Sequence, residues 1–142
     1  MNSPELTTDQ SASQPEPSGP HVLLVDDDAE IIESMRYALE SSGFRVSVAR
    51  DGNQGLAMVE ALRPDLLILD MMMPKRSGFL VLEQLRRQGL EGLPVIMVTG
   101  NEGHRHQQYA ELLGVDEYIC KPFPMDRLIK SAQRLTKTNP EA

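Results

Sequence analysis

The sequence predicts an α/β protein with a doubly wound, parallel sheet of five strands. Three observations lead to this fold class. Five short apolar runs alternate along the chain with five segments of helical periodicity. Three of these runs consist almost wholly of Val, Ile, Leu and Met, which is typical of parallel strands covered by helices on both faces. About 120 residues take part, which is about half the length that an eight-unit barrel needs.

The first two strand–helix units are predicted within residues 22–63. An apolar strand at 22–25 and a strand at 45–48 that alternates polar residues with Val are each followed by apolar side chains at helical spacing, over residues 28–42 and 52–63. Gly43 is a natural stop for the first of these helices, and Pro64 closes the second. The helix side chains predicted to face the core are Ile31, Ile32, Met35, Ala38, Leu39, Leu56, Val59 and Leu62.

The other three units repeat this plan. Their strands are predicted at residues 66–69, at 95–98 and within 115–120. Their helices are predicted at residues 77–88, 103–113 and 125–137. Ser77 caps the first of these helices, while Gly89 and Gly114 stop the first and the second.

The first 20 residues differ in composition from the rest. They hold four of the ten prolines, three acidic residues and no Lys or Arg, and their only apolar side chains are Met1, Leu6 and Ala12. Such a stretch buries too little apolar surface to offset the entropy lost on ordering. We therefore expect a disordered tail at 1–20, a folded domain at 21–137 and a short disordered tail at 138–142.

Composition excludes several classes of function. With 14 basic and 21 acidic residues the net charge is −7, which argues against direct contact with nucleic acid. The single cysteine, Cys120, excludes an intramolecular disulfide and a multi-cysteine metal site, and it is expected to be a buried strand residue. The chain has neither an apolar run near the roughly 18 residues of a membrane span nor a secretory signal. We expect a soluble, cytoplasmic protein with no membrane partner.

Polar side chains stand where the predicted strands end. They are Asp26, Asp27 and Asp28 after the first strand, Asp70 after the third, Thr99 after the fourth and Lys121 after the fifth. Because ligands of such sheets bind at this edge, these groups are expected to converge, although Asp28 is better explained as a helix cap. Clustered carboxylates favour a cation, and oxygen ligands suit Mg²⁺. The set predicts phosphoryl chemistry in which one carboxylate attacks.

These residues stand in recognisable motifs. The segments VLLVDDD, LLILDMMMPKRSG, VIMVTG and DEYICKPF occur in this order between His21 and Leu135. Together they resemble the receiver domain of two-component response regulators, the CheY-like family. The resemblance implies a flavodoxin-like sheet with strand order 2-1-3-4-5.

The resemblance also implies a role for each site residue. Asp70 is the phosphoacceptor, which takes a phosphoryl group from a phosphohistidine of a histidine kinase or of a phosphotransfer protein in a phosphorelay. Mg²⁺ is held by Asp26, Asp27, Asp70 and the backbone carbonyl of Met72. Thr99 and Lys121 contact the transferred phosphoryl group, Tyr118 is the switch residue that turns inward, and the Lys121–Pro122 peptide bond is cis.

The predicted function is a signalling switch and not an enzyme, apart from its own phosphotransfer and autodephosphorylation. Its output is expected from a surface within residues 101–135, through an effector protein, an effector domain or a phosphorylation-dependent homodimer. The sequence leaves open whether the receiver stands alone or belongs to a longer DNA-binding regulator. A Mg²⁺-dependent phosphatase with an aspartate nucleophile is a rival, since Asp26 and Asp28 fit its Asp-x-Asp spacing, but position 30 is Glu30 where that family has Thr. A pseudo-receiver acting through protein contact alone is a third alternative.

Overall fold

The computed structural model describes residues 19–73, 75–100 and 104–137. Its strands are β1 (His21–Val25), β2 (Arg45–Ala49), β3 (Leu66–Asp70), β4 (Val95–Thr99) and β5 (Glu117–Cys120). Its helices are α2 (Ala29–Ser41), α3 (Gly52–Leu62), α4 (Gly78–Arg87), α5 (His104–Leu112) and α6 (Met125–Thr136). All ten elements lie where the sequence predicts them. Residues 1–18 and 138–142, for which disorder is predicted, lie outside the described residues.

The five strands form one parallel sheet in the order β2-β1-β3-β4-β5. This order confirms the predicted doubly wound fold, because the chain builds outward from β1 in both directions. The strand order therefore reverses between β1 and β3. Side chains at the carboxyl ends of these two strands border the crevice in which such sheets bind their ligands.

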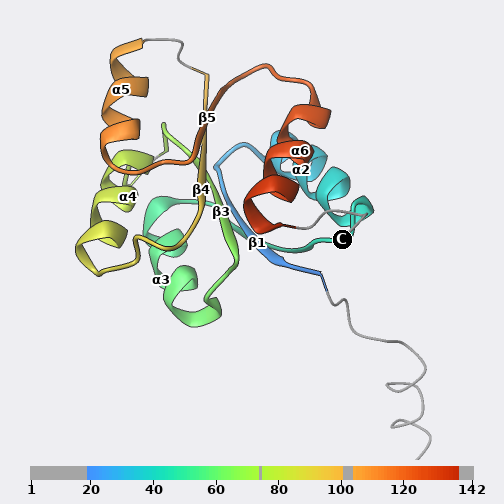
Figure 1. Ribbon diagram of the computed structural model, residues 1–142, viewed down its shortest axis with the longest axis horizontal. Helices are drawn as coiled ribbons and strands as arrows, with labels where there is room; N and C mark the ends of the chain where they lie inside the picture. Colours follow the sequence, from blue (N-terminus) through green and yellow to red (C-terminus); the bar gives the residue numbers. More distant parts are fainter. Residues whose placement is uncertain (1–18, 74, 101–103, 138–142) are drawn as a thin grey trace, which may run out of the picture.

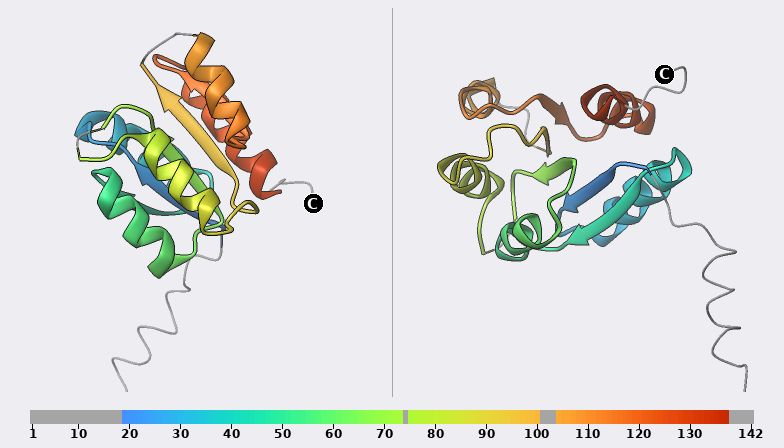
Figure 2. Two further views of the ribbon diagram at one scale, coloured as in Figure 1. Left: turned by 90° about the vertical axis from the view of Figure 1, so that its left-hand side faces the viewer. Right: turned by 60° about the horizontal axis from the view of Figure 1, so that its bottom comes forward.

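The helices cover both faces of the sheet, as Figures 1 and 2 show. Helices α2 and α6 lie side by side on one face, and α3, α4 and α5 lie on the other. Each face has its own core because side chains alternate along a strand. Val22 and Leu24 of β1 pack under α2 and α6, whereas Leu23 and Val25 pack under the other three helices. Every residue of β3 and β4 is buried, which explains their unbroken apolar sequences.

Local sequence explains where the helices begin. Asp28 caps α2 by accepting hydrogen bonds from the backbone N–H groups of Glu30 and Ile31. Asp51 caps α3 and Ser77 caps α4 in the same manner, each through one backbone N–H. Gly43 and Gly114 follow α2 and α5 with φ angles of 96° and 85°, a conformation that favours glycine.

The structure corrects three details of the prediction. Leu62, predicted to face the core, lies in the last turn of α3 and is 39% exposed. Cys120, predicted to be buried, is exposed because β5 is an edge strand and Cys120 ends it. Gly19 and Pro20, predicted to belong to the tail, accept hydrogen bonds from Arg45 through their carbonyl groups. Strand β5 lies within the predicted range of 115–120 and begins at Glu117, because the N–H of Val115 still bonds to the α5 residue Ala110.

Within the described part of the chain, no helix combines the length and apolar character that crossing a bilayer requires.

Candidate functional site

Three carboxylates meet at the carboxyl edge of the sheet. Asp26 directly follows β1, Asp27 comes next, and Asp70 is the last residue of β3. One carboxylate oxygen from each residue lies within 4.8 Å of the other two. Asp26 and Asp70 are buried, with 1% and 4% of their surfaces exposed, whereas Asp27 is exposed. The convergence predicted from the strand ends is therefore present.

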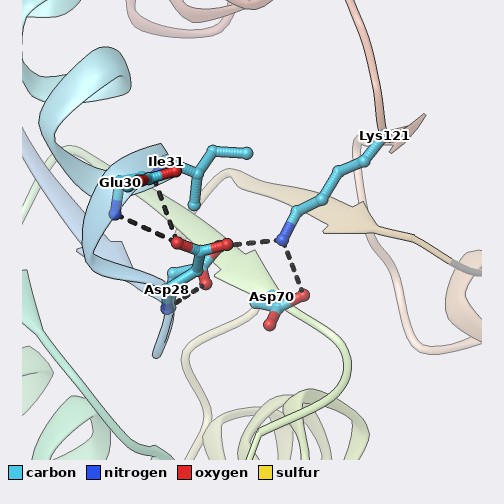
Figure 3. Close-up of polar contacts among 6 residues, drawn as sticks. Asp28, Glu30, Ile31, Asp70 and Lys121 are labelled. Atoms are coloured by element: carbon cyan, nitrogen blue, oxygen red, sulfur yellow. Dashed lines mark hydrogen bonds and ion pairs between the residues drawn. The ribbon is translucent and has the colours of Figure 1, made fainter.

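Lys121 brings a positive charge to this cluster. Its Nζ lies 3.2 Å from Asp26 Oδ2 and 3.6 Å from Asp70 Oδ1, and Figure 3 shows the side chain reaching toward Asp70. The Lys121–Pro122 peptide bond is cis. The Lys121 side chain is 21% exposed, so the ion pairs are shielded from much of the solvent that would weaken them.

The carboxylate cluster changes the acidity of Asp70. Burial, the largest cause, and the neighbouring charges of Asp26 and Asp27 together raise the pKa of this carboxyl from its usual 3.8 to about 6. The Lys121 ammonium and a hydrogen bond from the Met72 backbone N–H act in the opposite direction. At neutral pH Asp70 is thus ionised but crowded by like charges, a state that a bound cation relieves.

Two further polar residues lie at this edge of the sheet: Asp28 caps a helix, and Thr99 ends a strand beside the site. Asp28 turns away from the cluster to cap α2, as predicted, with Oδ1 lying 3.0 Å from the Glu30 nitrogen (Figure 3). Its own N–H donates to Asp26 Oδ1 over 3.0 Å, which fixes the orientation of that carboxylate. Thr99 is fully buried at the end of β4, on the strand that pairs with β3.

The donor set fits a hard divalent cation. Three carboxylates within 4.8 Å of one another offer charged oxygen ligands, and the exposure of Asp27 leaves room for water. Mg²⁺ commonly binds through one or two carboxylates and keeps several waters. Asp26, Asp27 and Asp70 would hold such an ion. The Met72 carbonyl as a further ligand stays a prediction, although the Met72 N–H already contacts Asp70.

Comparison with known proteins agrees with this geometry. Residues 22–133 match the family described as response regulator receiver domain. The chain belongs to this family. It is 37% identical over 121 residues to the response regulator MprA of Mycobacterium avium (strain 104), which covers 84% of this chain and 53% of that protein. The chain spans about half the length of the curated relatives that it matches.

Solved receiver structures share its architecture. The Francisella response regulator 1452 receiver domain superimposes with a TM-score of 0.80 at 32% identity, covering 84% of this chain and 98% of that one. The chemotaxis protein CheY4 of Vibrio cholerae gives 0.78 at 30% identity, covering 83% and 99%. This chain therefore carries a receiver domain of two-component signalling with the flavodoxin-like fold predicted from its motifs.

Tyr118 of this receiver lies beside the fourth strand end. Its ring packs partly buried against the core under α3, α4 and α5, and its hydroxyl is buried without a hydrogen bond of standard geometry to the described residues. Burial raises the pKa of the Tyr118 hydroxyl, as does Cys120, whereas the contact with Thr99 lowers it. The role of Tyr118 as a switch residue that turns inward stays a prediction.

Two contacts of the site could not be specified from the sequence. Lys121 was predicted to lie near the carboxylates, but its pairing with Asp26 in particular depends on side-chain reach across the sheet, which strand order alone does not give. The Met72 N–H that contacts Asp70 belongs to a loop whose path follows from contacts with α3. The glycine at position 52 is the one local sign of those contacts, because the loop approaches its backbone too closely for a side chain.

Proposed function

We propose that this receiver is a phosphorylation-controlled switch whose acceptor is Asp70. The observation that carries the proposal is the close approach of Asp26, Asp27 and Asp70, with the Lys121 ammonium beside two of them. A carboxylate that attacks a phosphorus atom needs cations nearby, because the phosphoryl oxygens carry negative charge. Asp70 has an ammonium within 3.6 Å and two further carboxylates with which to share a metal ion.

The proposed donor is a phosphohistidine on a sensor kinase or a phosphotransfer protein. A carboxylate oxygen of Asp70 attacks the phosphorus atom, and the bond from phosphorus to the imidazole nitrogen breaks. The electron pair of that bond returns to the ring nitrogen, which leaves a free histidine and an aspartyl phosphate. The carboxyl must be ionised to attack, and its pKa of about 6 satisfies this at neutral pH.

Each neighbouring residue has a proposed part in this step. Asp26, Asp27, Asp70 and the Met72 carbonyl hold Mg²⁺, which when bound neutralises charge on the phosphoryl oxygens. After transfer, Lys121 pairs with one phosphoryl oxygen through a charge-assisted hydrogen bond. The Thr99 hydroxyl donates to another. Beyond its own phosphotransfer and autodephosphorylation, the domain is proposed to catalyse no reaction.

The proposed output surface consists of α5, β5 and α6. Its two halves differ in charge. Glu111 and Asp116 border a cavity of about 190 Å³ on the α5 side, and Arg127 borders it from α6. Glu117 of β5 pairs with both Arg127 and Arg134. A twofold axis through this surface would place the acidic half of one copy against the basic half of another, which supports a phosphorylation-dependent homodimer.

The receiver is proposed to act through an effector. Because the chain spans about half of its curated relatives, the effector is either a separate protein or a further domain of a longer regulator, with DNA binding as one such output. The same surface of α5, β5 and α6 serves either arrangement, since phosphorylation changes its shape in both.

Phosphorylation by a small phosphodonor tests the proposal. Intact-mass spectrometry should show one phosphoryl group per chain in the presence of Mg²⁺ and none in the presence of EDTA. Asp70→Asn keeps the shape of the side chain but lacks the nucleophilic oxygen, so it should stay unmodified. Uptake by Asp70→Asn at the normal rate would overturn the assignment of the acceptor. Continued release of phosphate from a generic phosphate ester over many turnovers would instead support the phosphatase.

A further inference from the structure

The loop between β3 and α4 is in contact with the start of α3. Three consecutive residues, Asp51, Gly52 and Asn53, meet two residues of the loop, Lys75 and Arg76. The Arg76 Nε donates a hydrogen bond of 2.9 Å to Asn53 Oδ1, and the Lys75 Nζ lies 3.7 Å from Asp51 Oδ2. Between these two pairs the backbones touch, since a Cβ added to Gly52 would lie 2.3 Å from the Arg76 carbonyl oxygen. Only glycine fits such an approach.

The two ends of this loop are fixed by other contacts. At its start the Met71 N–H bonds to the carbonyl of Val98 in β4. At its end the Gly78 N–H bonds back to the Met71 carbonyl over 2.8 Å. Between these anchors Lys75 has a φ angle of 71°, in the left-handed region that a lysine rarely adopts. A loop in this conformation needs contacts that hold it there, and the start of α3 supplies them.

The loop matters to the site because it carries Met72. The Met72 N–H contacts the Asp70 carboxylate, and the Met72 carbonyl belongs to the proposed set of metal ligands. Three and four residues further along, Lys75 and Arg76 meet Asp51 and Asn53 at the start of α3. We expect relaxation of the loop there to shift the backbone of Met72 relative to Asp70, because few residues separate the two places. Asp51 and Asn53 themselves touch neither the acceptor nor the proposed metal ligands.

We propose that Asp51, Gly52 and Asn53 are positioning residues for phosphotransfer, which hold the β3–α4 loop so that the Met72 backbone faces Asp70. This inference rests on the proposed function. Asn53 is the cleanest probe of it. Its side chain is exposed, so its loss leaves no cavity, whereas Asp51 also caps α3 through the Gln54 N–H and Gly52 is buried in the contact.

The test is Mg²⁺ titration of the full chain, followed by the tyrosine and amide spectra and accompanied by thermal unfolding. Asn53→Ala should lower the Mg²⁺ affinity roughly three- to tenfold, the range expected for one lost hydrogen bond. Its melting temperature should stay close to that of the wild type. Glu60→Ala, an exposed substitution further along α3, is the matched control and should change neither quantity.

Rescue separates positioning from a general effect of charge. Asn53→Asp keeps an acceptor oxygen for Arg76 and should restore the affinity that Asn53→Ala loses. In an Arg76→Met background the same substitution should give no rescue, because the contact has no donor. Rescue that persists without Arg76 would show a charge effect and overturn the positioning role.

The outcomes distinguish this inference from the proposed function. If the wild type itself bound no Mg²⁺, the proposed metal site would fail and the positioning role with it. If the wild type bound Mg²⁺ and Asn53→Ala bound it equally well, only the positioning role would be overturned. The rate of phosphorylation by a small phosphodonor should follow the Mg²⁺ affinity across the set of variants.

Discussion

Lys121 and Asp26 form an ion pair of 3.2 Å that joins the ends of β5 and β1, two strands that are not neighbours in the sheet. The strands between them are β3 and β4. Strand β3 ends in Asp70, which lies 3.6 Å from the same ammonium. Lys121 therefore ties three strand ends together at the carboxyl edge of the sheet. Any metal ion held by Asp26 and Asp70 must share these carboxylates with a resident positive charge.

This sharing predicts that Lys121→Met tightens Mg²⁺ binding. Removal of the ammonium removes the repulsion between two cations and frees the carboxylate oxygens. At separations of several ångströms this repulsion is worth on the order of 1 kcal/mol, which corresponds to about a fivefold gain in affinity. Titration calorimetry at about pH 8, where carboxylates are ionised even with raised pKa values, measures it. Lys130→Met, an exposed change on α6, is the control, and unchanged affinity in Lys121→Met would show that the ammonium does not compete.

The raised pKa of Asp70 predicts that Asp70→Asn is more stable than the wild type at neutral pH. The folded protein holds the Asp70 proton up to about pH 6, whereas the unfolded chain releases it near 3.8. The free energy of unfolding of the wild type therefore falls as the pH rises through this window, and it loses nothing further above it. Because the carboxyl keeps some contact with solvent, the expected gain in the variant is about 1–2 kcal/mol.

Urea unfolding in EDTA measures this difference across the pH range. The advantage of Asp70→Asn should be full above about pH 7 and should shrink steadily toward about pH 4. An Asp70→Asn protein that is less stable than the wild type at neutral pH would show that the carboxylate cluster costs no stability. Asp65→Asn is no suitable control, since Asp65 accepts a hydrogen bond from His21. Asp126→Asn, an exposed change in α6, is suitable.

Much of the fold could be predicted because its signals are local. Buried parallel strands demand unbroken apolar runs, and Gly43, Gly114 and Ser77 mark helix ends through conformations and hydrogen bonds of their own. The site followed from the same logic, since parallel strands bring their carboxyl ends to one edge and Asp26 and Asp70 end two of them. The range predicted for β5, within 115–120, left its first residue open. The N–H of Val115 completes the end of α5, so the strand begins at Glu117.

What the sequence did not predict are contacts between segments far apart in the chain. The hydrogen bond between Asn53 and Arg76 links residues 23 positions apart through side chains of no particular periodicity. Arg86 is a second case. From the sequence it is a surface residue on the polar face of α4. In the structure it reaches the carbonyl groups at the end of α5, a contact that no pattern in either helix predicts.

Arg86 is predicted to contribute more stability than any exposed arginine near it. Its guanidinium donates to the carbonyls of Leu113 and Gly114, at 2.9 and 2.8 Å, and to those of Leu90 and Leu93 in its own loop. Burial lowers the pKa of Arg86, an effect that Asp116 and Glu91 oppose. Arg86→Met removes all four of these hydrogen bonds and should cost about 2–3 kcal/mol in urea unfolding.

Two further variants give this prediction its control. Arg86→Lys keeps the charge but lacks the planar fork that serves several acceptors, so it should recover little of the loss. Arg87→Met changes the neighbouring residue, which is exposed, and should cost less than about 0.5 kcal/mol. Equal losses in Arg86→Met and Arg87→Met would mean that the four hydrogen bonds add nothing to stability beyond those made to water.

Thr99 is predicted to couple the phosphoryl group to the output surface. Thr99 is buried at the end of β4, and Tyr118 on the adjacent strand β5 keeps its hydroxyl buried beside it. If the Thr99 hydroxyl moves to donate to a phosphoryl oxygen, the space behind it changes and the Tyr118 ring responds. The charge on Asp70 is the input, and the Thr99–Tyr118 pair is the element that it biases.

Thr99→Ala should therefore accept a phosphoryl group but fail to pass the signal on. Asp70 and the proposed metal ligands remain, so beryllium fluoride, a mimic of the phosphoryl group, should still bind with Mg²⁺. The amide NMR shifts that it causes in α5 and β5 should be reduced, because no hydroxyl draws residue 99 toward the mimic. Thr99→Ser keeps the hydroxyl and should respond like the wild type, while Lys121→Ala should fail in the same direction as Thr99→Ala. The complete wild-type set of shifts in Thr99→Ala would mean that the signal reaches α5 and β5 by a route that does not pass through Thr99.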